Sequence, residues 1–317
     1  MSFIRTVLGD IAPQDLGVCS PHEHLIIDPS FTTHETPDFL LDSVEAGISE
    51  LSEFHRNGGR AMVDSMPCDA GRNILKLAAL SRGSSVHVIA PTGLHLEKYY
   101  DPGHWGNRYS ETVLARLFTS DLQEGIDTHD YNGPEVCRTE HRAGVIKIAS
   151  GLDGIGERDQ KVFAAAVIAQ QATGCPILTH TEQGTAGLDQ VRYFADAGVD
   201  LRQVCLSHTD RKPDLAYHRE MLSTGVRLEF DSAFRWKPSQ ANPTRDLVAA
   251  LLPEFPDQIM LGMDAARRSY WKSYGGAPGL SFLITRFRAE LEKIGLSETL
   301  LDRVFVQTPA DWLRWRA

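Results

Sequence analysis

The stretch VIKIAS at residues 145–150 is a short, mostly apolar run bounded by glycine on both sides. IMLGMD at residues 259–264 has the same character. Such runs are expected for parallel strands that are covered on both faces. Eight candidate strands follow one another along the chain, at residues 17–26, 60–66, 86–92, 144–149, 176–180, 203–208, 226–231 and 258–264.

Helical patterns alternate with these strands, and several end on Gly or Asn, which suits a left-handed C-terminal cap. The patterns cover residues 39–57, 71–81, 158–173, 187–198, 215–225 and 242–252. Eight strand–helix units in 317 residues predict an α/β protein with a single (β/α)8 TIM barrel domain over residues 1–317. No GxGxxG follows the first strand, so dinucleotide binding is not supported.

The longest connection between strands is an excursion at about residues 93–143. It contains the helical segment ETVLARLFTSDL and several aromatic residues, among them Tyr99, Tyr100, Trp105 and Tyr109. Its length and aromatic content predict either a partly structured lid or subunit contact, or an ordinary packed excursion.

Composition limits the partners of the chain. The formal net charge of -10 disfavours nucleic acid as a partner, although a local basic pocket for a small anion stays possible. No membrane span or signal peptide is visible near Met1, which predicts a cytoplasmic protein. The five cysteines have no paired or CxxC spacing, and we expect reduced, buried thiols.

Titratable residues gather where the predicted strands end. In SPHEHLII the period of two turns His22 and His24 to one face of the first strand, so both imidazoles could bind one ion. His180 and His208 end the fifth and sixth strands, and Asp264 ends the eighth. Barrel active sites are built at these ends, so together the residues predict a metal centre. Taken alone, His180 and His208 are better explained as structural histidines, and Asp264 could cap a loop or pair with Arg267 or Arg268.

Lys147 lies in the middle of the apolar strand VIKIAS, where an ammonium group must be paired, neutralised or modified. Three interpretations follow from the residue alone. Lys147 could form a Schiff base, pair with a neighbouring acid, or be carboxylated to a carbamate that bridges two cations.

Five motifs together resemble the phosphotriesterase family of the amidohydrolase superfamily over nearly the whole chain. They are HEHL at residues 22–25, IKIA at 146–149, HTEQGTAG at 180–187, LSHTDR at 206–211 and GMD at 262–264. The C-terminal QTPADWLRW departs from the more usual Asn-Pro-Ala of the family, which affects no ligand. The resemblance implies a barrel with two divalent ions, the α ion on His22, His24 and Asp264, and the β ion on His180 and His208.

For Lys147 the resemblance implies the carbamate, with carbon dioxide as the added group. The carboxylated lysine and a hydroxide would then bridge two ions, which we expect to be zinc, with manganese or cobalt as alternatives. Asp264 would serve as the catalytic residue that takes a proton from the attacking hydroxide.

Basic and phenolic residues follow the seventh and eighth strands, where barrels of this kind seat phosphate groups. SAFRWK contributes Arg235 and Lys237, and AARRSYWKSYGG contributes Arg267, Arg268 and Tyr270. These charges could instead be solvated or paired. The second run resembles the branch of the family that hydrolyses phosphorylated furanose lactones, which implies a phosphate on Lys237, Arg267 and Tyr270. Spacing from Asp264 favours Arg267 over Arg268.

The predicted function is therefore a metal-dependent hydrolase that opens the lactone ring of a pentonolactone 5-phosphate or similar sugar lactone. An acyl-homoserine lactonase or phosphotriesterase is the alternative, and a Schiff-base lyase or a non-catalytic sugar-phosphate-binding barrel is more remote. The resemblance also suggests a homodimer.

Overall fold

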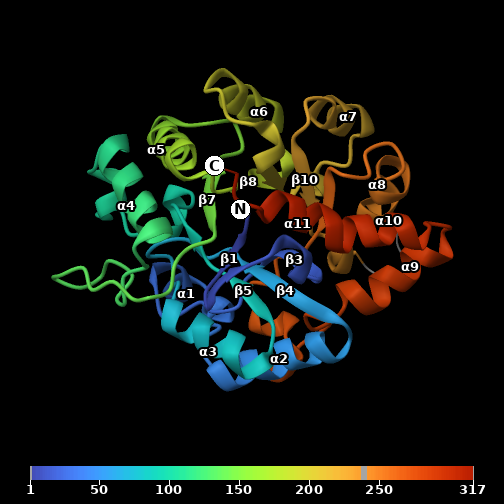
Figure 1. Cartoon of the computed structure of the whole chain (residues 1–317), viewed down its shortest axis with the longest axis horizontal. Helices are drawn as coiled ribbons and strands as arrows, with labels where there is room; N and C mark the ends of the chain where they lie inside the picture. Colours follow the sequence, from blue (N-terminus) through green and yellow to red (C-terminus); the bar gives the residue numbers. More distant parts are fainter. Residues whose placement is uncertain (1, 237–240, 317) are drawn as a thin grey trace.

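The computed structural model, which describes residues 2–236 and 241–316, shows a closed barrel of parallel strands surrounded by helices (Figure 1). The barrel strands are β3 (Val18–Glu23), β4 (Gly59–Asp64), β5 (His87–Ile89) with β6 (Pro91–Thr92), β7 (Val145–Ser150), β8 (Ile177–Thr181), β9 (Val204–Ser207), β10 (Arg227–Phe230) and β11 (Ile259–Leu261). The (β/α)8 TIM barrel predicted from the sequence is thereby confirmed.

Two seams close the barrel. The third predicted strand is interrupted at Ala90, so its first half, β5, pairs with β4 and its second half, β6, pairs with β7. Between the last strand and the first, the backbone N–H groups of Met263 and Asp264 donate to the carbonyl of His22 at 3.2 and 3.0 Å. Gly262 permits this approach, because a Cβ there would lie 2.9 Å from the Cβ of His22 and 3.0 Å from its carbonyl oxygen.

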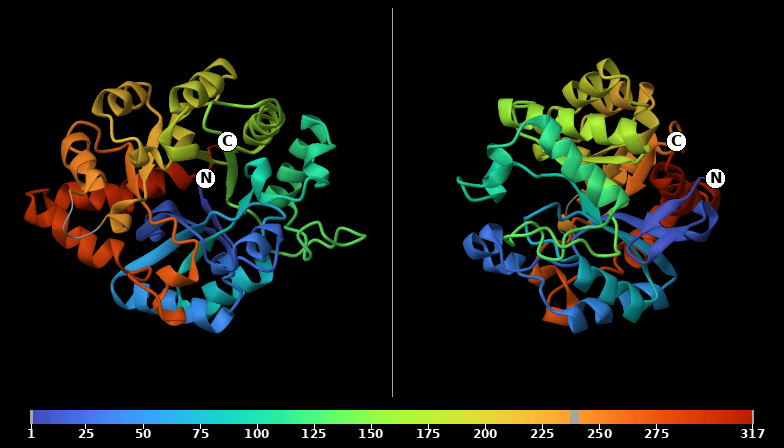
Figure 2. Two further views of the ribbon diagram at one scale, coloured as in Figure 1. Left: turned by 180° about the vertical axis from the view of Figure 1, so that it is seen from behind. Right: turned by 60° about the vertical axis from the view of Figure 1, so that its left-hand side comes forward.

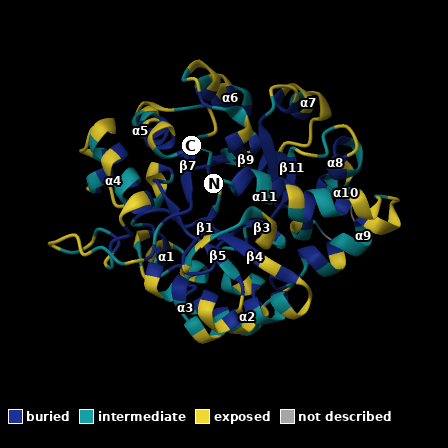
Figure 3. Cartoon of the chain, in the orientation of Figure 1, coloured by how far each residue is buried: buried dark blue, intermediate teal, exposed yellow. Residues whose placement is uncertain are grey.

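Helices cover the outside of the strands, and Figure 3 shows their buried faces turned toward the barrel. They are α1 (Phe31–Glu35), α2 (Val44–Arg56), α3 (Ile74–Ser84), α4 (Glu111–Gln123), α5 (Glu157–Thr173), α6 (Gly187–Asp196), α7 (Leu215–Ser223), α8 (Pro243–Leu251), α9 (Arg288–Lys293), α10 (Glu298–Asp302) and α11 (Thr308–Leu313).

Two helix starts differ from the sequence prediction. The helix predicted from residue 39 begins at Val44, because Ser43 caps it by accepting a hydrogen bond from the N–H of Ala46. The helix predicted from residue 71 begins at Ile74, because the side chain of Asn73 caps it in the same way.

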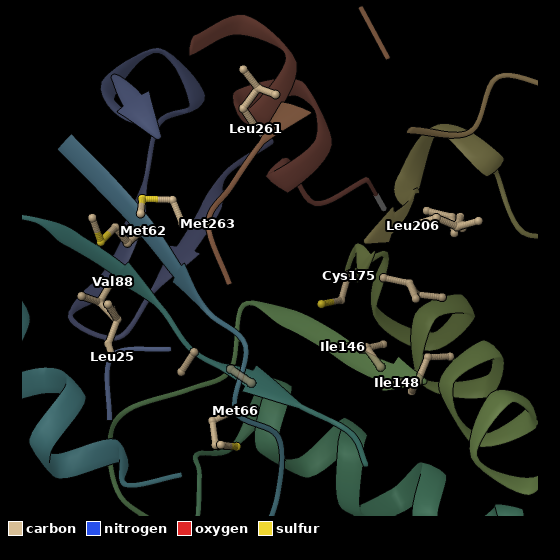
Figure 4. Close-up of a cluster of buried hydrophobic side chains, with 14 of the residues drawn as sticks. Leu25, Met62, Met66, Val88, Ile146, Ile148, Cys175, Leu206, Leu261 and Met263 are labelled. Atoms are coloured by element: carbon tan, nitrogen blue, oxygen red, sulfur yellow. The ribbon is translucent and has the colours of Figure 1, made fainter. Parts of the chain in front are cut away.

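The alternation of side chains along each strand separates two cores. Outward residues such as Ile146, Ile148, Leu206 and Leu261 pack beneath the helices (Figure 4). Inward residues fill the lower part of the barrel, where Val145, Leu178, Cys205 and Met260 pack with Trp312 of α11. Each fully buried side chain of this size contributes roughly 1.5–3 kcal/mol. Above this inner layer, the inward positions are polar.

The N-terminal hairpin of β1 (Ile4–Thr6) and β2 (Gly9–Ile11) was not predicted from the sequence, and neither were the helices after β11. Ile4 of the hairpin and Trp312 and Leu313 of α11 pack on the inner core and close the floor of the barrel. The two termini consequently lie near one another (Figure 2).

The excursion packs on the body of the molecule through α4. Phe118 and Leu122 of α4 are fully buried, and α4 packs against α5. The segment around the bridge between Asp127 and Arg138 projects from the body of the molecule (Figure 1). Whether this segment contacts a second subunit stays a prediction.

Four of the five free cysteines are buried, but Cys137 in the excursion is exposed, so the prediction of buried thiols was wrong at that position. Within residues 2–236 and 241–316, no helix is both long enough and apolar enough to cross a bilayer.

Candidate metal centre

The strand-end residues predicted from the sequence converge on one cavity of about 210 Å³ at the C-terminal end of the barrel. Side chains along a strand alternate between its two faces, and this explains the convergence. Lys147 and His180 follow the inward core residues Val145 and Leu178 by two positions, so they also point inward. The cavity is lined by His22, His24, His180, His208 and Asp264, together with residues of the surrounding loops.

His22, His24 and Asp264 form one group of possible metal ligands. Asp264 Oδ1 lies 3.2 Å from His24 Nε2 and 3.8 Å from His22 Nε2. Three donor atoms this close to one another, two imidazole nitrogens and a carboxylate oxygen, form a set that suits zinc or a related divalent ion.

A second group includes His22, His208, Glu229 and Asp231. His208 Nδ1 contacts the buried carboxylate of Asp231, while His22 Nδ1 lies 3.0 Å from Ser207 Oγ and 3.3 Å from Glu229 Oε2. The Nδ1 atoms of both rings are thus engaged, which leaves Nε2 of each ring for a metal. Carboxylates commonly orient metal-ligating histidines in this way.

His180 lies beside this group, with its ring centroid 4.5 Å from that of His208. Its Nε2 is 3.0 Å from Glu182 Oε2, so Nδ1 is the nitrogen left for a metal. The structure therefore places His180 next to His208, but no described trio of close donor atoms includes His180.

Lys147 is 1% exposed, and its Nζ has no hydrogen-bond partner among the described residues. Burial lowers the pKa of Lys147 to about 8, against the opposing effect of Asp264 and Glu229. A substantial fraction of its amine is therefore neutral near pH 8, as a lysine that reacts with an electrophile requires. Gly93 packs on this strand, since a Cβ there would lie 2.0 Å from the carbonyl oxygen of Lys147.

Two arginines hold the second carboxylate oxygen of Asp264. Arg211 donates to Oδ2 at 2.6 Å and also to Asp231 at 3.1 Å, and Arg235 donates to Oδ2 at 2.9 Å. Burial raises the pKa of Asp264, but His24 and the arginines outweigh burial and hold it well below its ordinary value.

His208 and Asp264 both have positive φ, at 66° and 49°. Left-handed backbone is uncommon for residues other than glycine and concentrates at functional sites.

Two of the three residues predicted to bind phosphate lie at the cavity. Arg267 and Tyr270 line the cavity, and the Arg267 guanidinium also stacks on Phe39. Arg268 does not line it and instead donates to Asp42 at 2.9 Å. Lys237 lies outside the described residues.

Sequence reasoning missed the roles of Arg211, Glu229, Asp231 and His95 in shaping this cavity. In LEFD at residues 228–231, acids alternate with apolar residues, a period-two signal that both acids face inward. Arg211 follows His208 closely in the LSHTDR motif. His95 follows the third strand, but the length of the excursion concealed its proximity to the site.

Comparisons with known proteins agree with this geometry. A phospho-furanose lactonase from Mycoplasmopsis agalactiae is 31% identical over 98% of this chain and 91% of its own length. The lactonase structure from Listeria monocytogenes has a TM-score of 0.91 and 28% identity, covering 99% of this chain and 100% of that one. A phosphotriesterase homology protein from Escherichia coli, solved with phosphate in its active site, has a TM-score of 0.85 and 28% identity over 94% of this chain and 99% of that one.

The family model supports the same assignment over nearly the whole chain. The phosphotriesterase family model matches residues 2–313, which include every strand of the barrel and every proposed ligand. Metal-dependent hydrolysis is typical of that family, and the donor groups around His22 supply a candidate metal site. This chain is therefore a hydrolase, and it belongs to the phosphotriesterase family.

Proposed function

We propose that this chain opens the lactone ring of a phosphorylated sugar lactone, of the pentonolactone 5-phosphate type, by metal-dependent hydrolysis. The main observation behind the proposal is that one cavity holds both cation-binding and phosphate-binding side chains. Histidines and Asp264 at its base suit cations, whereas Arg235, Arg267 and Tyr270 at its rim suit a phosphate. The relatives named as lactonases, and the related structure with phosphate in its active site, support this combination.

The metal ligands in this proposal are His22, His24 and Asp264 for one ion, His180 and His208 for the second, and carboxylated Lys147 between them. The fit is supported by buried polar atoms of the proposed ligands that have no partners among the described residues, namely Lys147 Nζ and His24 Nδ1. Buried polar atoms without partners are costly, and that cost at Lys147 would be relieved if its amine were carboxylated and the carbamate bound cations. When bound, the two ions supply an activated water nucleophile and polarise the lactone carbonyl. We propose zinc, with manganese or cobalt as alternatives.

Asp264 accepts the proton that the attacking water loses. Its carboxylate is well placed because His24 approaches Oδ1 while Arg211 and Arg235 fix Oδ2. A carboxylate with a pKa below its ordinary value releases that proton readily to the leaving alkoxide when the ring C–O bond breaks. The leaving oxygen stays tethered to the product, so stabilising charge on the carbonyl oxygen matters more than acid assistance.

The cavity favours a small anionic substrate over the alternatives. At about 210 Å³ it is below the usual 300–1,000 Å³ range for drug-sized ligands, which disfavours a long acyl chain. An acyl-homoserine lactone or an uncharged organophosphate ester would also bring no phosphate to Arg267, whose partner within the chain is Asp38 at 3.6 Å. A Schiff-base role for Lys147 would require activity without metal.

The deciding experiment measures metal content and hydrolysis together. Purified protein is assayed for divalent ions and then for kcat/KM on pentonolactone 5-phosphates, the unphosphorylated lactones, an acyl-homoserine lactone and an organophosphate triester. Two charge-assisted contacts of roughly 1.5–3 kcal/mol each should favour the phosphorylated lactone by about 10²–10⁴-fold. Full activity after chelation, or a preference for the acyl lactone, would contradict the proposal.

Asp264→Asn isolates the proton acceptor within the same assay, because an amide oxygen can still ligate an ion but cannot take the proton. We expect metal to remain partly bound while kcat falls strongly. A homodimer is also proposed, and light scattering of the purified protein tests it independently.

A further inference from the structure

The cavity has two walls of opposite character. Arg211, Arg235 and Arg267 come from the loops after β9, β10 and β11, and they give one wall three guanidinium groups, of which Arg211 and Arg235 pair with Asp264 and Arg267 lies 3.6 Å from Asp38. His95 and Tyr99 come from the loop after β6, at the end of the third barrel strand. In a closed barrel of eight strands, the third and seventh strands are diametrically opposed, so His95 and Tyr99 face the guanidinium wall across the metal centre.

A backbone hydrogen bond determines where His95 carries its proton. The N–H of Leu96 donates to His95 Nδ1 at 2.8 Å, so Nδ1 is an acceptor and has no proton. A neutral imidazole with a free Nδ1 carries its hydrogen on Nε2. Among the described residues, Nε2 of His95 has no hydrogen-bond partner, and the ring lines the cavity. His95 therefore presents one neutral, directed N–H donor.

The surroundings of His95 hold this donor in place. Its own N–H donates to the hydroxyl of Tyr100 at 2.9 Å, and its carbonyl accepts a hydrogen bond from Arg158. Its ring packs edge-on against Tyr99 at 4.5 Å and His180 at 4.8 Å between centroids. A donor fixed on both the main chain and the ring is preorganised, and preorganised polar groups discriminate most strongly between substrates.

Tyr99 adds a second neutral group to the same wall. Within the described part of the chain, its hydroxyl makes no hydrogen bond, although its ring lines the cavity. The nearby Lys98 is exposed and pairs with both oxygens of Glu182 at 3.0 Å. This wall thus offers hydrogen bonds without a free cation, which suits a hydroxyl group better than a phosphate.

We propose that His95 and Tyr99 form a hydroxyl-binding subsite, in which His95 Nε2–H donates to the ring hydroxyl next to the lactone carbonyl. The proposal rests on the proposed lactonase function and specifies its substrate as a 2-hydroxylated lactone. The position follows from packing, because the His95 ring contacts His180, a proposed ligand at the reacting end of the cavity. The phosphate end lies across the cavity, near Arg267.

The kinetic test compares three substrates and three enzymes. The substrates are a pentono-1,4-lactone 5-phosphate, its 2-deoxy analogue and, as the matched control, its 3-deoxy analogue. Wild-type protein should prefer the parent over the 2-deoxy analogue by about ten-fold in kcat/KM, as one neutral hydrogen bond permits. His95→Phe keeps a planar ring but removes the donor, so this ratio should fall toward one. His95→Gln restores an N–H donor and should recover part of it.

The 3-deoxy ratio separates a specific contact from general damage, because His95→Phe should leave that ratio unchanged. Equal efficiency of wild-type protein on the parent and the 2-deoxy analogue would overturn the subsite alone. No hydrolysis of any phosphorylated lactone by metal-loaded wild type would overturn the proposed function and the subsite with it.

A second measurement does not depend on turnover. The protein is labelled with ¹⁵N-histidine and kept free of metal, and the ring signals of His95 are identified by their loss in His95→Phe. These signals should show an unprotonated Nδ1 and a protonated Nε2. A protonated Nδ1 would remove the donor from the cavity and overturn the inference.

Discussion

Two buried clusters of charged residues in this molecule are alike in composition. They differ in whether each polar atom has a hydrogen-bond or ion-pair partner. In the first, Arg72 is completely buried beneath the excursion, where it donates to Asp121 at 3.0 Å, to Asp130 at 2.9 Å and to the carbonyl of Pro91. Tyr131 completes the cluster by donating to the other oxygen of Asp121. Every charge in this cluster has a partner within the chain.

The second cluster, at the strand ends, is incomplete by the same measure. Lys147 Nζ, His24 Nδ1 and Glu229 Oε1 lack hydrogen-bond partners among the described residues. Buried polar groups in folded proteins are nearly always satisfied, so such an excess indicates groups held ready for a ligand. Both clusters are buried and charged. What distinguishes the structural cluster from the candidate metal centre is that its polar atoms all have hydrogen-bond or ion-pair partners.

Lys147→Ala should have the largest effect, because it removes the group proposed to join the two ions. We expect metal content and hydrolysis to be lost together, with partial recovery of both when a short carboxylic acid is added. Metal analysis and kcat measured on the same preparation test this expectation.

Lys161→Ala is the matched control, since Lys161 lies on α5 and donates to the carbonyl of Asn107. It should retain both metal and activity. Trapping of a substrate adduct on Lys147 by borohydride in the wild-type protein would instead indicate a Schiff base and contradict the carbamate.

Arg267→Met should have an intermediate effect that is confined to phosphorylated substrates. Loss of one charge-assisted contact of roughly 1.5–3 kcal/mol predicts about a 10–10²-fold decrease in kcat/KM on the phosphorylated lactone. The unphosphorylated lactone should lose far less, because it has no group for Arg267 to bind.

Arg268→Met provides a sharp control one residue away. Arg268 is oriented toward Asp42 and the carbonyl of Leu40, so its loss should not change the preference for phosphate. Equal losses for Arg267→Met on both substrates would remove Arg267 from the phosphate site.

Local patterns in the sequence predicted the positions of the strands well, because apolar runs and strand-end polar residues are properties of a few adjacent residues. VIKIAS placed Lys147 inside an apolar strand, and SPHEHLII placed His22 and His24 on one face of another. Ala90 shows the limit of this reasoning, since the interruption of the third strand depends on which neighbour each half pairs with. No local pattern contains that information.

The contacts of the site residues could not be predicted from the sequence either. Arg268 and Arg267 are adjacent in sequence, yet the first is bound to Asp42, more than 200 residues away, and the second lines the cavity. The contact between His95 and His180 joins an excursion to a strand end. Long-range packing decides such contacts, whereas spacing along the chain could only make Arg267 the favoured choice.

Arg72→Met should have the smallest effect on chemistry, and it tests the comparison from the structural side. Asp121 and Asp130 would remain buried without their cation, and removal of one partner of a buried ion pair costs roughly 3–5 kcal/mol of stability. Urea unfolding should therefore shift strongly, while metal content and kcat per folded molecule should stay close to wild type. Arg82→Met removes an exposed arginine of α3 whose guanidinium lies 3.8 Å from Glu140, and it should change stability by less than about 1 kcal/mol. If Arg72→Met instead lost metal while staying folded, the Arg72 cluster would be part of the active site. The presence of hydrogen-bond partners would then no longer distinguish a structural group of charges from a functional one.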